Sequence, residues 1–214
     1  MVVMKMFPRF SASKVLASAA LMLFAFTGAF AQGKVFNKDY TGITAIEAII
    51  TTHEGVIVVD LDFKAAPNTV ANFVDLAQKG FYDGLTFHRV INGFMIQGGD
   101  FTRRNGTGGH SAKGPGTTIG DKYDPCLTHM RGALSWAKTA MPNSIGSQFF
   151  IVHGDNVHFL DHDQVGPGPA DGYSVFGQLY EGFDVLDDIA SVKTDRRDAP
   201  YDDVIIESVT IEKA

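Results

Sequence analysis

Short apolar runs separated by polar turns recur along the chain from residue 45 onward, and many of them are rich in β-branched side chains. This pattern is typical of β-strands. The runs 45–50 and 56–61 flank His53-Glu54-Gly55 and together predict a β-hairpin. A later run at 204–211 predicts a strand that closes the sheet near the end of the chain. The pattern therefore predicts a core made mainly by β-structure.

Two segments instead place apolar residues three to four positions apart, which indicates amphipathic helices. One is predicted over 67–79, where a proline occupies the first helical position and Gly80 can end the helix. The other is predicted over 182–192. Glycine is frequent between the elements, at 103–121 and, with proline, at 163–172. Short strands, two helices and glycine-rich turns predict a closed all-β barrel. The apolar stripes are Val70, Phe73, Val74 and Ala77 in the first helix and Val185, Leu186 and Ile189 in the second.

The N-terminal 31 residues have the layout of a secretory signal peptide. They contain three basic residues and no acid, then an apolar run over 15–30, then Ala29-Phe30-Ala31. We expect cleavage before Gln32 and export to the periplasm. An uncleaved membrane anchor is the alternative. The predicted organisation is a signal peptide over 1–31, an N-terminal extension over 32–44 and one globular domain over 45–214.

Composition limits the partners of this domain. The 214 residues are 45% hydrophobic and 20% charged, which suits a single domain with a sizeable core. Removing Lys5, Arg9 and Lys14 leaves 15 basic against 24 acidic residues, a net charge of −9, so nucleic acid and anionic lipid are poor partners. Cys126 is the single cysteine, so no disulfide forms within the chain, and we assign it no function.

The stretch 87–100 carries the candidate chemistry. Alternation predicts a strand over 87–91, a turn at Asn92-Gly93 and a second strand, so that Arg89, Met95 and Gln97 share one face. The stretch holds no serine or cysteine nucleophile, no carboxylate pair and no cluster of metal ligands. The chemistry that remains is hydrogen bonding beside an apolar pocket, which suits a neutral, partly apolar substrate.

A metal site can be considered at residues 158–163, where two histidines stand four positions apart beside aspartates. On a helix the two imidazoles would share a face. The glycine- and proline-rich continuation argues against a helix there, and the sequence specifies no third ligand. We therefore expect no metal.

The segment FHRVINGFMIQGGDFTRRNGTGG, together with GSQFFI at 146–151, resembles the cyclophilin family of peptidyl-prolyl cis/trans isomerases. The resemblance runs from about residue 45 to 212 and includes LSWAK at 134–138, HFLD at 158–161 and SVFGQL at 174–179. It implies a closed, eight-stranded antiparallel β-barrel capped by two α-helices, with the site on its outer face. It also implies an enzyme that needs no cofactor and acts as a monomer.

Carried over residue by residue, the resemblance implies a catalytic role for Arg89, whose guanidinium would stabilise the twisted X-Pro amide, and for Gln97. Gln97 and Gln148 would hold the substrate backbone, and Gly106 and Ala137 would line the adjoining groove. The proline pocket would be formed by Phe94, Met95, Phe150 and Leu160.

Three positions depart from the family pattern. Phe159 stands where many eukaryotic members have tryptophan, Trp136 where methionine is common and Tyr173 where a histidine often lies. The first two are expected to preserve an apolar wall, and Phe159 implies weak binding of the family inhibitor cyclosporin. The expected substrates are X-Pro bonds in unfolded or flexible exported polypeptides. The alternatives are a non-catalytic proline-peptide binding module or chaperone on the same fold, or a small-molecule carrier.

Overall fold

A computed structural model describes residues 40–155, 157–162 and 172–214. The predicted signal peptide, residues 32–39 of the predicted extension and most of the loop over 163–172 lie outside the described residues. None of the described helices is long and apolar enough to cross a bilayer. The elements are β1 (Ile46–Thr52), β2 (Gly55–Leu61), α1 (Pro67–Gln78), β3 (Leu85–Thr86), β4 (Arg89–Ile91), β5 (Met95–Gly98), β6 (Ala133–Trp136), β7 (Phe149–Val152), a single 3-10 turn (His158–Leu160), β8 (Val175–Glu181), α2 (Phe183–Ala190) and β9 (Ile205–Lys213).

The predicted hairpin and closing strand are confirmed. Strands β1 and β2 pair antiparallel from Glu47 opposite Asp60 to Thr52 opposite Gly55. The hydroxyl of Thr52 accepts hydrogen bonds from two backbone N–H groups of the turn, at distances of 3.2 and 3.1 Å, so the turn is held from within. Strand β9 pairs along the other edge of β1.

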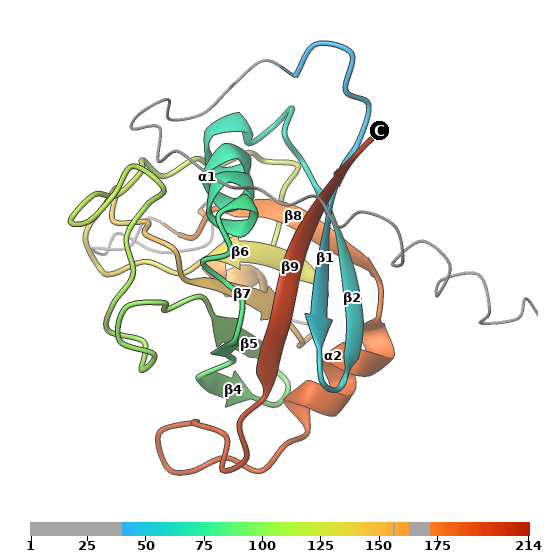
Figure 1. Ribbon diagram of the computed structural model, residues 1–214, viewed down its shortest axis with the longest axis vertical. Helices are drawn as coiled ribbons and strands as arrows, with labels where there is room; N and C mark the ends of the chain where they lie inside the picture. Colours follow the sequence, from blue (N-terminus) through green and yellow to red (C-terminus); the bar gives the residue numbers. More distant parts are fainter. Residues whose placement is uncertain (1–39, 156, 163–171) are drawn as a thin grey trace, which may run out of the picture. The chain divides into compact units, whose positions relative to one another are not determined.

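Both predicted helices are confirmed, and they lie toward opposite ends of the sheet (Figure 1). Helix α1 begins at Pro67, and Gly80, just beyond its last turn, has φ of +69°, the left-handed conformation expected of a glycine that ends a helix. Helix α2 lies by the β1–β2 turn, where a β-carbon at Gly55 would lie 2.6 Å from a methyl group of Val185. Leu186 and Ile189 of its predicted stripe are buried, and Val185 is partly buried.

The strands form one antiparallel sheet in the order β3-β9-β1-β2-β8-β6-β7-β5-β4. Its two end strands, β3 and β4, are separated in the chain by only Phe87 and His88. The Cα atoms of Thr86 and Arg89 therefore lie within about 11 Å of each other, three steps of 3.8 Å. This short connection brings the two ends of the sheet close together, so the sheet must curl.

The predicted all-β architecture, an antiparallel sheet with two α-helices, is confirmed, and it differs from the predicted closed, eight-stranded barrel in strand number and in closure. The described sheet has nine strands, and its end strands are not hydrogen-bonded to each other. The reason is that a loop occupies the free edge of β4, where the N–H of Val90 donates to the carbonyl of Asp198 at 2.8 Å. On the β3 side, the N–H of Phe87 donates to the carbonyl of Val204 at 3.0 Å and so continues the pairing of β3 with β9.

The strands divide their side chains between two apolar clusters. In β7, Phe149 and Ile151 point to the main core, whereas Phe150 and Val152 belong to a second cluster. This alternation is the period of two of a β-strand. Strand β5 does the same with Ile96 in the core. The second cluster, which carries the candidate site, therefore lies on the face of the sheet opposite the main core.

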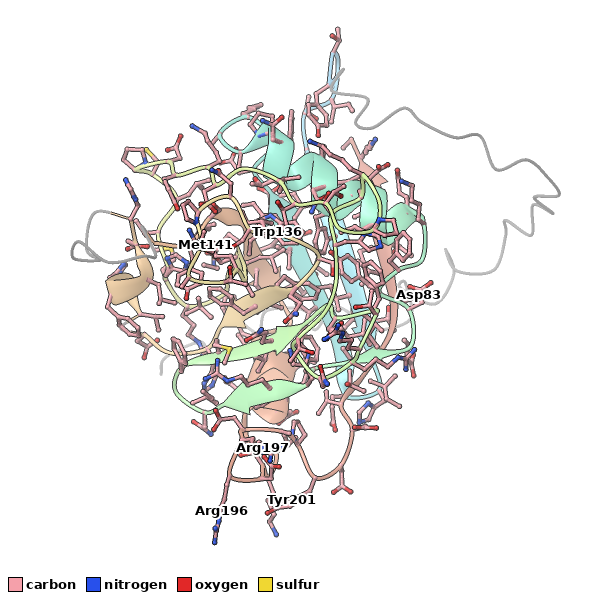
Figure 2. The ribbon with its side chains drawn as sticks, turned by 90° about the vertical axis from the view of Figure 1, so that its left-hand side faces the viewer. Asp83, Trp136, Met141, Arg196, Arg197 and Tyr201 are labelled. Atoms are coloured by element: carbon pink, nitrogen blue, oxygen red, sulfur yellow. The ribbon has the colours of Figure 1, made fainter. Side chains whose placement is uncertain are left out.

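Trp136 belongs to the main core, so the prediction that it walls the site is wrong. It is fully buried and stacks on Phe176 with ring centroids 4.7 Å apart, and it meets Phe73 of α1 edge-on at 6.1 Å. Trp136 is labelled in Figure 2, which draws the side chains of the described residues. Strand alternation in β6 explains the error, because Trp136 shares a face with Leu134 of the main core, whereas the next residue, Ala137, packs on the second cluster.

Candidate functional site

A pocket of about 200 Å³ opens in the second cluster and brings together most of the predicted site residues. The strands β5 and β7 supply its floor, and the 3-10 turn at 158–160 and the start of the 173–175 segment supply its far wall. The lining combines an apolar base with two cations and one amide. Its residues are Arg89, Phe94, Met95, Gln97, Ala137, Lys138, Phe150, Leu160 and Tyr173.

Arg89 and Gln97 stand directly opposite each other on the paired strands β4 and β5. Opposite residues of an antiparallel pair point to the same face, so the prediction that they share a face with Met95 is confirmed. The Arg89 side chain is 43% exposed, and its Nε lies 3.3 Å from Oδ2 of Asp198. Gln97 Nε2 donates to Oε1 of Gln148 at 3.0 Å, so the two amides form one unit. The cation and the amide pair thus lie side by side at the mouth of the pocket.

Gln148 and Gly106 lie in an adjoining groove of about 350 Å³, which shares Gln97 and Ala137 with the pocket. Gln148 Nε2 donates to the carbonyl of Gly108 at 2.8 Å, which ties strand β7 to the glycine-rich loop. Gly106 has φ of +84°, and a β-carbon there would lie 3.1 Å from Nε2 of His88. Only glycine meets both conditions without strain. The groove and the pocket are therefore continuous, as expected for an extended ligand.

Phe159 lies at the rim and is not among the residues that line the pocket. The residue is 58% exposed, and its ring stacks on that of Phe94 with centroids 5.8 Å apart. The 3-10 turn explains this position, because successive side chains of such a turn point in different directions, so that Leu160 faces the pocket and Phe159 faces solvent. Phe159 therefore extends the apolar surface beyond the pocket.

Lys138 was missed at the level of the sequence, although it directly follows Ala137 in LSWAK. Its side chain is fully buried, and Nζ lies 3.0 Å from Oδ2 of Asp121 and 3.0 Å from the hydroxyl of Tyr123. Burial alone would lower the pKa of this ammonium, but the bonds to Tyr123 and Asp121 outweigh it and raise the pKa. Lys138 therefore stays charged and joins the wall shared by pocket and groove to the 121–123 segment.

A buried polar network supports the floor of the pocket from behind. His129 lies parallel to Phe150 with ring centroids 5.8 Å apart, and its Nδ1 is 2.6 Å from Oδ1 of Asp161. Its Nε2 is 3.0 Å from the hydroxyl of Ser135. Burial lowers the pKa of His129, against the opposing effect of Asp161. The three groups resemble a nucleophile, base and orienting acid, but Ser135 and His129 are fully buried, so no substrate reaches the hydroxyl. The network positions Phe150.

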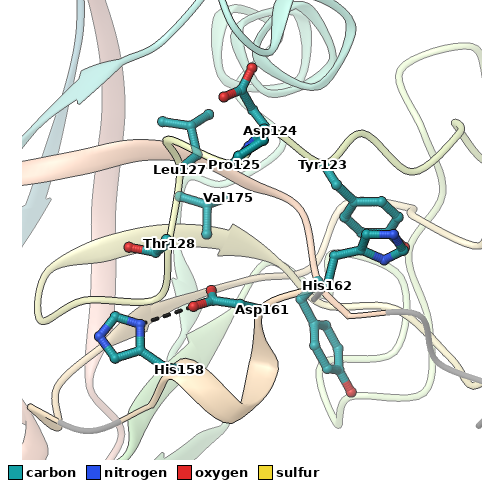
Figure 3. A pocket seen from close by; sticks show the side chains of 10 residues that line it. Tyr123, Asp124, Pro125, Leu127, Thr128, His158, Asp161, His162 and Val175 are labelled. Atoms are coloured by element: carbon teal, nitrogen blue, oxygen red, sulfur yellow. Dashed lines mark hydrogen bonds and ion pairs between the residues drawn. The ribbon is translucent and has the colours of Figure 1, made fainter. Parts of the chain in front are cut away.

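A second hollow, of about 540 Å³ and drawn in Figure 3, also has Tyr173 in its lining. Its apolar floor includes Leu127 and Val175. Nδ1 of His158 lies 2.9 Å from Oδ2 of Asp161, a contact drawn as a dashed line in Figure 3. No group of three or more potential metal ligands occurs among the described residues. The hollow lacks a cation on its lining, and we assign it no catalytic part.

The fold and the pocket define a class of protein: a curled antiparallel sheet that carries, on its outer face, a small apolar pocket between an arginine and two linked glutamines. The chain belongs to the cyclophilin-type peptidyl-prolyl cis-trans isomerases. The family model described as "Cyclophilin type peptidyl-prolyl cis-trans isomerase/CLD" matches residues 48–211.

Individual relatives agree with this assignment. The chain is 38% identical over 180 residues to peptidyl-prolyl cis-trans isomerase A of Dickeya dadantii strain 3937, covering 84% of this chain and 88% of that protein. A crystal structure of a cyclophilin-type peptidyl-prolyl cis-trans isomerase from Cryptosporidium parvum superposes with a TM-score of 0.71 at 32% identity, covering 80% of this chain and 99% of that one. A second structure of the Cryptosporidium protein, obtained in the presence of the dipeptide Ala-Pro, gives a TM-score of 0.70 at 33% identity over 78% of this chain and 99% of that chain.

Proposed function

We propose that this peptidyl-prolyl cis-trans isomerase acts at the pocket between Arg89 and Phe150. The observation that carries the proposal is the register of β4 and β5, which puts a guanidinium and an amide at the mouth of an apolar pocket of about 200 Å³. The proline ring would enter the pocket and rest on Met95, Phe150 and Leu160. The Ala-Pro dipeptide used with the Cryptosporidium relative supports a proline-containing peptide as the ligand.

The reaction is a rotation, and no bond is made or broken. Amide resonance gives the X-Pro bond a barrier of about 18 to 20 kcal/mol, and unaided rotation takes tens to hundreds of seconds. Millisecond turnover requires the barrier to fall by about 7 kcal/mol, since each tenfold in rate corresponds to about 1.4 kcal/mol. Only contacts that are stronger in the twisted state than in either planar state can supply this difference.

Arg89 is the group best suited to make such contacts. A guanidinium remains charged and offers several donors in a planar fork, which can reach the emerging lone pair of the proline nitrogen or hold the carbonyl of the twisted amide. The pocket fixes the proline ring while the part of the substrate before it turns. Gln97 and Gln148 would hold the substrate backbone, and the groove beside Gly106 would receive the residues that precede the proline.

We also propose that the mature protein is a monomer that works on exported proteins, with X-Pro bonds of unfolded or flexible segments as its targets. The acidic balance of the chain supports polypeptide substrates over nucleic acid or anionic lipid. The N-terminal sequence, which has the layout of a signal peptide, supports export to the periplasm.

Substitution of Arg89 tests the proposal. We expect Arg89→Ala to lower kcat/KM on a proline tetrapeptide about 100-fold, the scale observed when one donor to a transition state is removed. Arg89→Lys should also be strongly impaired, because an ammonium lacks the planar fork. Both variants should keep the wild-type melting temperature within a few degrees, since Arg89 is half exposed and its ion pair is worth about 1 kcal/mol at most.

The matched control is Arg196→Ala. Arg196 is exposed and Figure 2 shows it at the tip of the 194–200 loop, pointing away from the strands. We expect this variant to turn over at the wild-type rate. Turnover at the wild-type rate by Arg89→Ala would refute the proposed role. A wild-type protein that binds a proline peptide but does not isomerise it would favour the non-catalytic binding module instead.

A further inference from the structure

The loop over 194–200 covers the free edge of β4 and is built as a closed unit. Its ends are paired, with the N–H of Asp195 donating to the carbonyl of Ala199 at 2.8 Å. Inside it, the carboxylate of Asp195 accepts the N–H groups of Arg197 at 2.7 Å and Ala199 at 3.0 Å. The carbonyl of Asp198 accepts the N–H of Val90 at 2.8 Å. The loop is therefore fixed against β4 at the residue next to Arg89.

Asp198 occupies an unusual position in this loop. Its φ of +65° is a left-handed conformation that residues other than glycine adopt rarely, with aspartate and asparagine among those that tolerate it best. Its carboxylate, Oδ2, lies 3.3 Å from Nε of Arg89. Both side chains are about two-fifths exposed, at 43% and 40%. A half-exposed pair of this kind adds little to stability, so its significance lies in its geometry.

The contact uses one particular nitrogen of the guanidinium. Nε is the nitrogen nearest the side-chain stem, and a bond there restrains rotation of the planar group. The two terminal nitrogens carry the remaining N–H donors, and the Arg89 side chain lines the pocket. A partner on Nε thus orients the fork without consuming the donors at its end.

We infer that Asp198 is a positioning residue: its carboxylate, held by the 194–200 loop, orients the guanidinium of Arg89 toward the pocket. The inference rests on the proposed function, because orientation matters only if Arg89 acts on the substrate. Asp198 is not among the residues that line the pocket, so it is not itself a catalytic residue.

Two substitutions distinguish the effect of the Asp198 carboxylate from the effect of the loop backbone. Asp198→Gly accepts the positive φ without strain and removes every side-chain acceptor. Asp198→Asn tolerates the same φ and keeps one acceptor oxygen for Nε, but carries no charge. We expect Asp198→Gly to lower kcat about tenfold with KM nearly unchanged, because a loosened donor weakens the twisted state more than the bound planar substrate. Asp198→Asn should stay within about threefold of wild type.

The decisive measurement is a double-mutant cycle with Arg89→Ala, with Asp202→Gly as the control for an exposed carboxylate nearby. If Asp198 acts through Arg89, Asp198→Gly should not reduce the residual turnover of Arg89→Ala further, and Asp202→Gly should behave as wild type. Wild-type kcat in Asp198→Gly, or the same tenfold loss in the Arg89→Ala background, overturns the inference. If Arg89→Ala itself is fully active, both the inference and the proposed function fail; if it is inactive while Asp198→Gly is normal, the inference alone fails.

Discussion

Phe159 places an exposed aromatic ring where ligands larger than proline would extend out of the pocket. Its contact with Phe94 keeps the rim apolar, but phenylalanine has no hydrogen-bond donor. The tryptophan common at this position in the family would add an indole N–H and a larger surface. A proline ring held within the pocket makes little use of either. The residue at this position should therefore affect the binding of large ligands much more than the binding of small ones.

We therefore predict weak cyclosporin inhibition of the wild type and stronger inhibition of Phe159→Trp. A gained hydrogen bond is worth about 0.5 to 1.5 kcal/mol, and the larger contact area adds to it, so the inhibition constant should fall by at least about twofold. Turnover of a proline tetrapeptide should change by less than about threefold. Inhibition curves on the two proteins under the same conditions check this. Phe159→Leu, which shortens the rim without adding a donor, is the control and should not gain sensitivity.

The glycine-rich loop after β5 is organised by one carboxylate. Oδ1 of Asp100 accepts the N–H groups of Thr102 and Arg103, and Oδ2 accepts those of Asn105, Gly106 and Gly108, at distances between 2.9 and 3.2 Å. Burial would raise the pKa of Asp100, but these backbone bonds outweigh it and lower the pKa. A loop with little apolar content thus gains a defined shape, which places Gly106 and the Gly108 carbonyl beside the groove.

Asp100→Asn should destabilise the protein by about 3 kcal/mol, because the amide NH₂ cannot accept and leaves several partly buried N–H groups without partners. For a domain of this size that corresponds to a fall in melting temperature of roughly 6 to 12 °C. Thermal unfolding followed by circular dichroism measures it. The control Asp202→Asn changes an exposed carboxylate and should stay within about 0.5 kcal/mol of wild type. An Asp100→Asn variant that melts with the wild type would contradict the organising role of this side chain.

At the scale of the whole molecule, the N-terminal 31 residues differ from the rest of the chain in charge and in apolar content. Their layout predicts export to the periplasm. The excess of acidic residues in the remainder suits a protein that stays in solution once the signal peptide is cleaved. The isomerase assignment does not depend on them, because the family match begins at residue 48.

We predict that protein recovered from the periplasm of a Gram-negative host begins at Gln32. Intact-mass measurement of the periplasmic fraction shows this directly. Ala31→Arg should block processing, since signal peptidase requires a small residue before the cleaved bond, and the full-length chain should then remain with the membrane. Wild-type protein that retains Met1 and is found only in the membrane fraction would favour an anchor instead.

Local signals in the sequence were sufficient for the first hairpin, both helices, the last strand and the part of the pocket that lies on the β4–β5 hairpin. The propensities of residues within a few positions of one another determine the hairpin over 46–61. They also determine where α1 begins, at Pro67, and where it ends, near Gly80. The same is true of the β4–β5 hairpin, whose period of two and Asn92-Gly93 turn put Arg89 and Gln97 on one face. The motif resemblance then added Phe150 and Leu160 from more distant segments.

What only the tertiary structure decided depends on contacts between segments that are far apart in the chain. Whether the sheet closes was decided by the loop over 194–200, in which the carbonyl of Asp198 accepts the edge N–H of Val90 in β4. The side on which Trp136 is buried was decided by its packing against Phe73 of α1. Arg89 and Asp198 are separated by 109 positions, and Lys138 and Asp121 by 17. No local propensity encodes such pairs, because the free energy of a contact between distant segments appears only once the sheet has curled and brought them together.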